Sequence, residues 1–252
     1  MQNSQPLYRQ LAVYYDAIYG FKDYAAEAKR VEDLIRRFGP ENGRSLLDIG
    51  CGTGHHLRYW RRHFDCVGLD SSPAMLRMAR GRLPGVRFVL GKMQTFALGR
   101  KFDAITCMFS AIGYVKDLRD LRATIRNFGA HLNPGGVVVV EPWLEPKDYA
   151  AGHPSLLVYE TRNLKIARAS YSHLRGKQSE IEMQYLVVRR GKGIQHFSES
   201  HRCPLFDRKQ MLAAFRAEGL HPNFFARGFS SGRGLYVATS PYKRLVKSRS
   251  GR

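Results

Sequence analysis

The sequence has no long apolar run and few cysteines. Its longest purely aliphatic stretch, Val137–Val140, is far shorter than the roughly 20 residues needed to span a membrane. The N-terminus has no basic region followed by an apolar one. The four cysteines show no paired CxxC spacing. These absences argue against secretion or a membrane anchor and predict a reduced, cytoplasmic protein.

Acidic residues are scarce beside basic ones. The 252 residues include 41 Lys and Arg against 21 Asp and Glu, a formal net charge of +20. Such a surplus raises the local concentration of nucleic acid, anionic lipid or phosphorylated metabolites, and charge alone does not choose among them. Part of it lies in residues 241–252, which we interpret as a basic, disordered tail.

No metal site is expected. His55 and His56 are adjacent rather than four residues apart, and none of the nine histidines forms a zinc spacing with a cysteine. The sequence has no internal repeat and no low-complexity block, and 44% of its residues are hydrophobic. The chain is therefore long enough and apolar enough to bury one sizeable core.

Short apolar runs alternate with helical patterns through the first 143 residues. Glycine and proline turns separate these segments, and Asp23, Ser72 and Asp117 are good caps for the helices that follow. Alternating strands and helices predict a parallel sheet with helices on both faces, an α/β fold of Rossmann-like type. Strands are expected at 45–49, 66–69, 86–90, 104–108 and 137–140, and helices at 24–38, 55–64, 73–83 and 117–132.

The pattern changes after Trp143. Apolar and polar residues alternate through 181–187, and we predict an antiparallel β insertion over residues 155–204, between the fifth strand and the last helix. Residues 1–154 and 205–240 would form one Rossmann-like domain around it. The returning elements are expected to be a helix at 207–218 and strands near 220–226 and 235–238.

The strongest local signal is a glycine-rich turn directly after a predicted strand. Residues 46–54 read Leu-Leu-Asp-Ile-Gly-Cys-Gly-Thr-Gly, and a helix is expected next. Glycine has no Cβ, so the backbone can approach a ligand closely, and a helix start offers free N–H groups to a carboxylate or phosphate. The spacing is GxGxG and not the GxGxxG of dinucleotide-binding proteins.

A carboxylate follows at the end of the next predicted strand. Asp70 comes sixteen residues after Gly54, where its oxygens can accept both hydroxyls of a ribose. The alternative is a plain glycine turn together with an aspartate that only caps the helix at Ser72. The turn and the carboxylate together are more informative than either part, and they favour a ligand that contains a nucleoside.

These segments resemble the successive motifs of class I S-adenosylmethionine methyltransferases. Asp48–Gly54, Gly68–Leu76 and Leu132–Gly136 match them in order and at the usual spacing. The resemblance implies S-adenosyl-L-methionine as cofactor, with its ribose at Asp70 and its adenine beside Met93. The other positions that it assigns to the cofactor are Tyr24, Asp48, Gly50, Cys51, Gly52, Gly54, Ser71, Met75, Lys92 and Met108.

A closer resemblance covers nearly the whole chain. Residues 22–24, 108–114, 137–143, 194–201 and 231–235 are similar to the amino-sugar N,N-dimethyltransferases that finish TDP-linked 3-amino deoxysugars for macrolide antibiotics. The matches at 141–143 and 231–234 discriminate, because generic methyltransferases do not share them. The resemblance implies N-methylation of a TDP-linked amino deoxysugar, and it suggests a homodimer.

Residue roles follow from this closer resemblance. Arg233 would meet the pyrophosphate of the substrate, and Tyr8 is a weaker match, one residue out of register. The implied catalytic residues are Tyr24, Tyr114 and Glu141, and the implied substrate-binding residues are Tyr8, Tyr114, Trp143, Ser231 and Arg233.

One position departs from the family pattern. The family has Gly-Asp-Met after the third strand, whereas this chain has Gly91-Lys92-Met93, and an ammonium group cannot accept a hydrogen bond from the adenine amino group. Losing one hydrogen bond of about 1 kcal/mol weakens cofactor binding several-fold without abolishing it. If Lys92 points to solvent, nothing beyond that contact is lost.

Other functions stay open at the level of the sequence. A nucleic-acid methyltransferase would suit the charge, but residues 109–112 contain no Asn-Pro-Pro-Tyr element, and Cys203 precedes its proline rather than following it. Another small-molecule amine could occupy the same pocket, and the chain could be a non-catalytic binding module with a degenerate methyltransferase fold. Tyr14, Tyr15 and Tyr19 either cap a substrate pocket or belong to the core.

Overall fold

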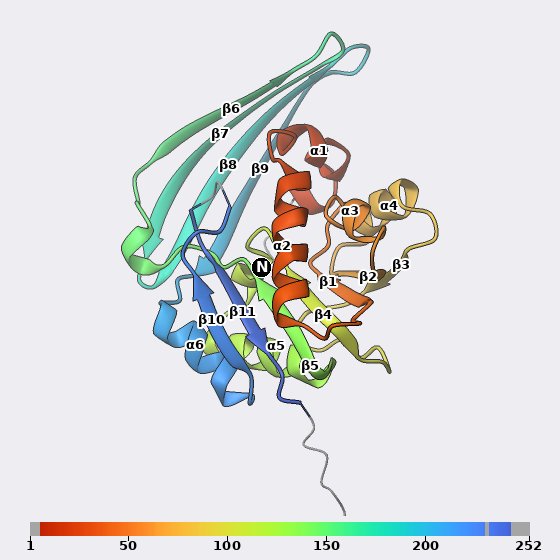
Figure 1. The fold of residues 1–252 in the computed structure, drawn as a ribbon. Helices are drawn as coiled ribbons and strands as arrows, with labels where there is room; N and C mark the ends of the chain where they lie inside the picture. Colours follow the sequence, from red (N-terminus) through yellow and green to blue (C-terminus); the bar gives the residue numbers. More distant parts are fainter. Residues whose placement is uncertain (1–5, 230–231, 243–252) are drawn as a thin grey trace, which may run out of the picture.

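The computed structural model describes residues 6–229 and 232–242, and it contains two β-sheets (Figure 1). The larger sheet has seven strands in the order β10-β11-β5-β4-β1-β2-β3. Strands β1 to β5 are parallel to one another, and β11 joins antiparallel to β5 and β10. This is the predicted Rossmann-like arrangement. The strands are β1 (Ser45–Ile49), β2 (Asp65–Asp70), β3 (Arg87–Leu90), β4 (Phe102–Cys107), β5 (Leu132–Val140), β10 (His221–Phe225) and β11 (Leu235–Thr239).

Helices cover both faces of this sheet, because successive strand residues point to opposite sides. In β5, Val138 and Val140 belong to the core beneath α5 (Leu118–Ala130) and α6 (Arg208–Ala217). Val137 and Val139 belong to the core on the other face. The helices on that face are α2 (Tyr24–Phe38), α3 (Leu57–Trp60) and α4 (Pro73–Arg82).

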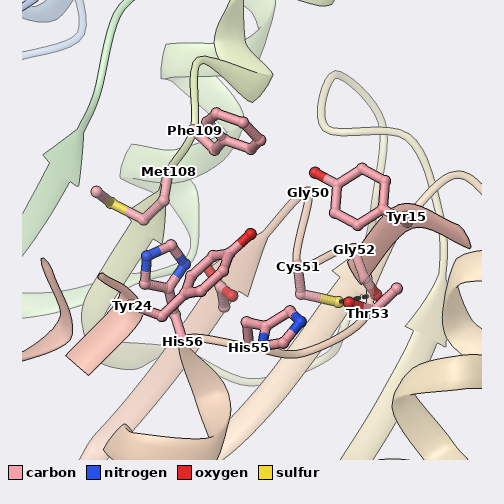
Figure 2. A pocket seen from close by; sticks show the side chains of 11 residues that line it. Tyr15, Tyr24, Gly50, Cys51, Gly52, Thr53, His55, His56, Met108 and Phe109 are labelled. Carbon is pink, nitrogen blue, oxygen red and sulfur yellow. Dashed lines mark hydrogen bonds between the residues drawn. The ribbon is translucent and has the colours of Figure 1, made fainter. Parts of the chain in front are cut away.

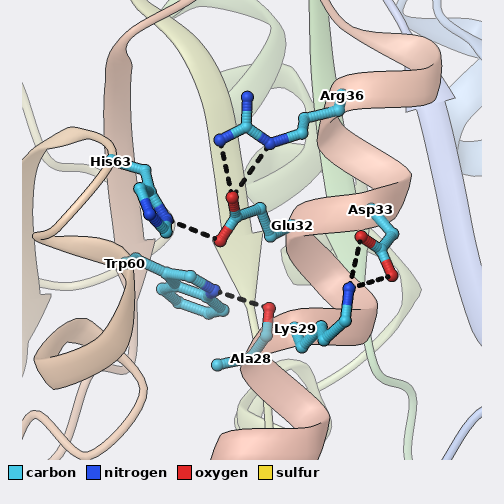
Figure 3. A network of polar contacts seen from close by, with 7 residues as sticks. All are labelled: Ala28, Lys29, Glu32, Asp33, Arg36, Trp60 and His63. Atoms are coloured by element: carbon cyan, nitrogen blue, oxygen red, sulfur yellow. Dashed lines mark hydrogen bonds and ion pairs between the residues drawn. The ribbon is translucent and has the colours of Figure 1, made fainter.

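Helix α2 is fixed at its start and along its flank. The side chain of Asp23 accepts a hydrogen bond from the Ala26 amide and caps the helix. Farther along, Trp60 of α3 donates to the Ala28 carbonyl at 3.0 Å, and Glu32 accepts from Arg36 and lies 3.0 Å from His63 (Figure 3). The buried indole bond joins α2 to α3, and the neighbouring ion pairs are exposed and contribute little.

Most predicted elements agree with the structure to within a few residues, and two predictions were wrong in detail. The helix expected over 55–64 is α-helical only at Leu57–Trp60, with turns on either side. The turn expected at 133–136 lies inside β5, where the pairing register with β4 is irregular.

The second sheet is antiparallel and projects from the body as an arm (Figure 1). The N-terminal segment packs between this arm and the body: Leu11 and Ile18 share a core with Ile166 and Tyr185 of the arm and with Met75 of α4. That segment consists of η1 (Pro6–Tyr8), η2 (Ala12–Tyr14) and α1 (Tyr15–Ile18), and the arm of β6 (Pro154–Glu160), β7 (Leu164–Arg175), β8 (Gln178–Arg189) and β9 (Gly193–Pro204).

Candidate active site

A pocket lies at the carboxyl ends of β1 and β4, where the strand order of the parallel sheet reverses (Figure 2). In open α/β sheets this crevice is where ligands bind. The pocket is lined by Tyr15, Tyr24, Asp48, Gly50, Cys51, Gly52, Thr53, His55, His56, Met108 and Phe109.

The glycine turn forms the floor of the pocket. Gly50, Gly52 and Gly54 have φ of 68°, 54° and 80°, which non-glycine residues rarely adopt. A Cβ at Gly50 would come within 2.6 Å of the Cβ of Ala111, whereas one at Gly52 would meet no atom within 4 Å. The backbone at Gly52 is therefore open to a bound molecule, as a cofactor lying against this turn requires.

Asp70 lies outside the pocket lining, next to the glycine turn, and is held there by backbone amides. Its Oδ2 accepts from the Gly52 amide at 2.9 Å, and its Oδ1 accepts from the Ser72 amide at 2.8 Å. Burial raises the pKa of Asp70, and these amides partly offset that effect. A carboxylate oxygen can accept more than one hydrogen bond, so Asp70 retains acceptor capacity for ribose hydroxyls.

Asp48 lies deeper, at the end of β1. It is 2% exposed and accepts a hydrogen bond from the Thr106 hydroxyl at 2.8 Å. Burial raises the pKa of Asp48 to about 6, although the neighbouring His56 opposes this. A buried acidic group of this kind favours a cationic partner, such as the amino group of a methionine moiety.

Tyr24 begins α2 and covers one side of the pocket. Its ring stacks on His55 with centroids 4.3 Å apart, and its edge meets His56 at 5.1 Å. The buried Glu27 lies 2.9 Å from His56 Nε2 and accepts from Lys22 at 2.6 Å. Burial raises the pKa of Glu27, but its bonds to His56 and Lys22 prevail and hold it below its usual value.

Asp16 fastens the N-terminal segment to the glycine turn. Its Oδ1 accepts from Thr53 Oγ1 and lies 2.8 Å from His55 Nε2, and its Oδ2 pairs with Arg82. Burial alone would raise the pKa of this carboxyl, yet the bonds to His55 and Thr53 and the charge of Arg82 hold it at about 2. Asp16 is therefore ionised at neutral pH and bridges three parts of the site.

A strained turn follows β4 at the opposite side of the pocket. Phe109 and Ser110 are non-glycine residues with φ of 51° and 57°, a conformation that costs about 1 kcal/mol or more for each. The buried Glu141 accepts from the Phe109 amide at 2.7 Å, and Ser110 donates to the Pro142 carbonyl at 2.6 Å. The end of β5 thus holds the end of β4 in this shape.

Arg233 lies against the same turn. It donates to Ser110 Oγ at 2.9 Å, lies 3.7 Å from a Glu141 oxygen, and stacks its guanidinium 4.8 Å from the centre of the Trp143 ring. Burial lowers the pKa of Arg233, which the Glu141 carboxylate opposes. Its Nε is buried and has no hydrogen-bond partner among the described residues. Trp143 itself donates to Ser179 at 2.8 Å.

Tyr8 and Tyr114 meet beside this region. Their hydroxyl oxygens are 2.7 Å apart, and their rings are edge to face at 5.7 Å. Tyr8 also lies 6.4 Å from the ring of Tyr15, which lines the pocket. The two predicted substrate residues are therefore neighbours, one ring away from the predicted cofactor site.

The remaining predicted residues lie outside the pocket lining. Ser71 and Lys92 are exposed, and the ammonium group of Lys92 cannot replace the missing acceptor. Met75 is fully buried against the N-terminal segment, Met93 packs on the core, and Gly54 is buried just behind the turn. Ser231 lies outside the described residues, as do residues 243–252 of the predicted tail.

Several lining residues were not assigned from the sequence. The sequence places Thr53 in the glycine turn, His55 and His56 in an unsuitable metal pair and Phe109 after a strand, and it gives none of them a binding role. Of the tyrosine stripe, Tyr15 both lines the pocket and belongs to the core, whereas Tyr14 and Tyr19 pack against that core. Thr53, His55 and His56 lie in or directly after the glycine turn, and this proximity in the sequence could have identified them as lining residues.

Neither a metal-binding cluster nor a membrane-spanning helix is found within residues 6–229 and 232–242. There is no group of three or more His, Cys, Asp or Glu side chains that could hold a metal ion. No helix there is long and apolar enough to cross a membrane.

Comparison with known proteins places this site in a family. A model of the methyltransferase domain matches residues 23–222. A dTDP-3-amino-3,4,6-trideoxy-alpha-D-glucopyranose N,N-dimethyltransferase from Streptomyces venezuelae is 45% identical over 217 residues, which cover 86% of this chain and 91% of the relative. A dTDP-3-amino-3,6-dideoxy-alpha-D-glucopyranose N,N-dimethyltransferase from Streptomyces fradiae is 43% identical and covers 90% of each chain.

Solved structures of similar proteins support the same family. The crystal structure of Streptomyces venezuelae DesVI has a TM-score of 0.86 and 44% identity, covering 92% of this chain and 98% of that one. CalS10, an amino pentose methyltransferase from Micromonospora echinaspora solved with S-adenosylmethionine bound, has a TM-score of 0.81 and 38% identity, covering 92% and 96%. The chain therefore belongs to the S-adenosylmethionine-dependent methyltransferases and, among them, to the family of the amino-sugar N-methyltransferases.

Proposed function

We propose that this enzyme methylates the amino group of a dTDP-linked amino deoxysugar, with S-adenosyl-L-methionine as the methyl donor. The relatives named above act on such sugars, and a pocket is present here at the end of the parallel sheet. Bound S-adenosylmethionine supplies an electrophilic methyl group. The work of the chain is to hold the acceptor nitrogen in line with that methyl group and to exclude water.

The observation that carries the substrate proposal is the environment of Arg233. Its guanidinium is mostly buried, lies over the Trp143 ring, and has one buried N–H without a partner among the described residues. A planar guanidinium suits the oxygens of a diphosphate, which it can engage with two parallel hydrogen bonds. We infer that Arg233 binds the diphosphate and that the sugar extends from there toward the glycine turn.

The acceptor amine must be unprotonated when it attacks. A free alkyl amine is mostly ammonium near neutral pH, and burial disfavours the charged form. We infer that Tyr24, Tyr114, Glu141 and Trp143 wall the pocket in which this occurs. Glu141 already accepts from the Phe109 amide and lies near Arg233, so it supports the turn and balances the guanidinium charge.

Calorimetric titration tests the proposal in two steps. The protein is titrated with S-adenosylhomocysteine and then, in the same cell, with dTDP. Binding of both is expected. A flat first titration would contradict cofactor binding and support the non-catalytic interpretation. A flat second titration alone would overturn the nucleotide-sugar acceptor and return the choice to another small amine or to RNA.

The proposal also covers the cellular location, the oligomeric state and the domain division of the enzyme. We infer a cytoplasmic location because all four cysteines are buried and unpaired. A homodimer is inferred only from the resemblance. The division into residues 1–154 with 205–240, an insertion at 155–204 and a tail at 241–252 is inferred from the change of pattern along the sequence. Size-exclusion chromatography with light scattering tests the dimer.

A further inference from the structure

A row of buried polar side chains runs from the arm to the mouth of the site. Tyr114 Oη lies 2.8 Å from His201 Nδ1, and His201 Nε2 lies 2.9 Å from an oxygen of Glu199. His201 is 5% exposed, and the Glu199 side chain is 0% exposed. At the other end of the row Tyr114 is 37% exposed. The row thus joins an interior carboxylate to a tyrosine that is partly exposed.

The partners of Glu199 show that its oxygens act as acceptors. Its Oε2 accepts from the Leu7 amide at 3.0 Å, and its Oε1 accepts from the Tyr185 hydroxyl at 2.7 Å. Burial would raise the pKa of Glu199, but the neighbouring His201 and these donors prevail and lower it. His201 Nε2 lies 2.9 Å from this carboxylate without hydrogen-bond geometry and has no other partner among the described residues. An ionised carboxylate so close repels a bare lone pair, which favours a proton on His201 Nε2.

The tautomer of His201 then orients Tyr114. With Nε2 protonated, the Nδ1 of a neutral imidazole is an acceptor, so Tyr114 donates its hydroxyl proton to it. Tyr114 Oη in turn accepts from the Tyr8 hydroxyl. One lone pair of Tyr114 Oη remains. The arrangement repeats the logic of a nucleophile, a histidine and an orienting carboxylate, with a tyrosine at the outer position.

We propose that Tyr114, His201 and Glu199 form a relay that removes a proton from the acceptor amine before methyl transfer. This inference rests on the proposed function. Tyr114 is the group that meets the amine, and His201 and Glu199 are positioning residues that act through it. Nothing in the sequence motifs assigned a role to Glu199 or His201, because they come near Tyr114 only through the packing of β9 against the helical turn Ala111–Tyr114.

The proton transfer balances without an added reagent. An N–H bond of the bound ammonium breaks, and its electron pair stays on nitrogen as the nucleophilic lone pair. The proton passes to Tyr114 Oη, while the hydroxyl proton of Tyr114 passes to His201 Nδ1. The resulting imidazolium is stabilised by the Glu199 carboxylate. His201 returns this proton to solvent through Tyr114 after the product leaves.

The groups around His201 are few. From η1, Tyr8 lies edge to face with its ring at 5.9 Å, and from the helical turn at Ala111–Tyr114, the Tyr114 ring lies at 5.8 Å. On β8 the cross-strand neighbour of His201 is Ile181, and Tyr185 faces Glu199. On its own strand the titratable neighbours are Glu199 and Cys203, a buried thiol whose pKa burial raises to about 12. Glu199 is therefore the charged group that faces His201 at contact distance.

The test compares methylation rates of wild type and His201→Gln over a pH series. The acceptor is dTDP-3-amino-3,6-dideoxyglucose and the donor S-adenosylmethionine. At neutral pH we expect kcat to fall about a hundredfold, the range for loss of a proton-transfer group, with KM for the acceptor changed less than about threefold. As pH rises toward about 10, where a free amine is unprotonated, the deficit should shrink to a few-fold. Glu199→Gln should behave in the same way.

A matched control lies on the same strand. His196 is exposed on β9 and pairs only with Gln184, so His196→Gln should leave kcat unchanged at every pH. A deficit of His201→Gln that is the same at all pH values would overturn the relay and leave a structural role. If wild type does not methylate this acceptor, the proposed function itself fails.

A second readout needs no turnover. Nitrogen-15 spectra of protein labelled at histidine, with S-adenosylhomocysteine bound, report which ring nitrogen of His201 carries the proton, and His201→Gln assigns the signal. We expect a neutral ring protonated at Nε2, and a loss of that preference in Glu199→Gln. A proton on Nδ1 in wild type would reverse the direction of the hydrogen bonds and contradict the proposal.

Discussion

The carboxylate of Asp70 accepts a hydrogen bond from the amide of Gly52 at 2.9 Å, so the two sequence signals for a nucleoside ligand are in contact. One carboxylate therefore supports the glycine turn and keeps further acceptor sites beside it. Charge at this position serves both tasks, because hydrogen bonds to an ionised acceptor are stronger than those to a neutral one.

Replacing Asp70 with Asn should weaken cofactor binding. The amide keeps one acceptor oxygen but loses the charge and half of the acceptor capacity, a loss of about 1.5–3 kcal/mol that corresponds to roughly ten- to a hundredfold in Kd. Calorimetry with S-adenosylhomocysteine measures it. Asp65→Asn, at the exposed start of the same strand, is the control and should bind as wild type does.

Replacing Asp48 with Asn should stabilise the ligand-free protein while weakening cofactor binding. Burial raises the pKa of Asp48 to about 6 from 3.8, so the folded state holds a proton that the unfolded state has lost between these values. Stability from this group is present below pH 3.8 and is lost as pH rises to 6 and above. At pH 7.5 the variant should therefore gain roughly 1–3 kcal/mol of unfolding free energy.

Thermal unfolding of both proteins at pH 5 and pH 7.5 checks this. The Tm advantage of Asp48→Asn should be larger at the higher pH. An equal or smaller advantage at pH 7.5 would show that Asp48 is not held in the way described.

Replacing Asp16 with Asn should loosen the N-terminal segment. Asp16 bridges Thr53, His55 and Arg82, and the amide cannot pair with the guanidinium as an ion. We expect Kd for S-adenosylhomocysteine to rise about tenfold, since roughly 1.4 kcal/mol of lost support corresponds to that factor. Limited proteolysis should cut within residues 6–23 faster than in wild type. Asp33→Asn, an exposed partner of Lys29 on α2, is the control.

Replacing Arg233 with Lys should weaken acceptor binding without affecting the cofactor. Lysine keeps the charge but loses the planar pair of donors and the flat contact with Trp143. We expect Kd for dTDP to rise about tenfold or more, since hydrogen bonds between charged groups contribute about 1.5–3 kcal/mol each. Arg126→Lys, an exposed partner of Glu218, serves as the control. Unchanged dTDP binding in Arg233→Lys would move the diphosphate site elsewhere.

The sequence predicted those parts of the fold that depend on local pattern. The valines of β5 and the capped helices α2 and α5 show their periodicity within a few residues, and the glycines at 50, 52 and 54 announce their positive φ by residue type. The helix expected at 55–64 is short because the residues on either side of Leu57–Trp60 form turns.

What the sequence could not predict depends on contacts between distant segments. Tyr114 and His201 are 87 residues apart and meet only because the arm folds back on the body. Asp16 reaches Arg82 across 66 residues. The positive φ of Phe109 and Ser110 is likewise imposed by Glu141 and Pro142, and nothing in their residue types indicates it.

The most direct test of the account is mass spectrometry of dTDP-3-amino-3,6-dideoxyglucose incubated with the enzyme and S-adenosylmethionine. The account predicts products heavier by one and then two methyl substitutions, both on nitrogen, with dTDP-glucose left unmodified because it has no amine. An unmodified amino sugar, in a sample that binds S-adenosylhomocysteine, would contradict the assignment of the acceptor.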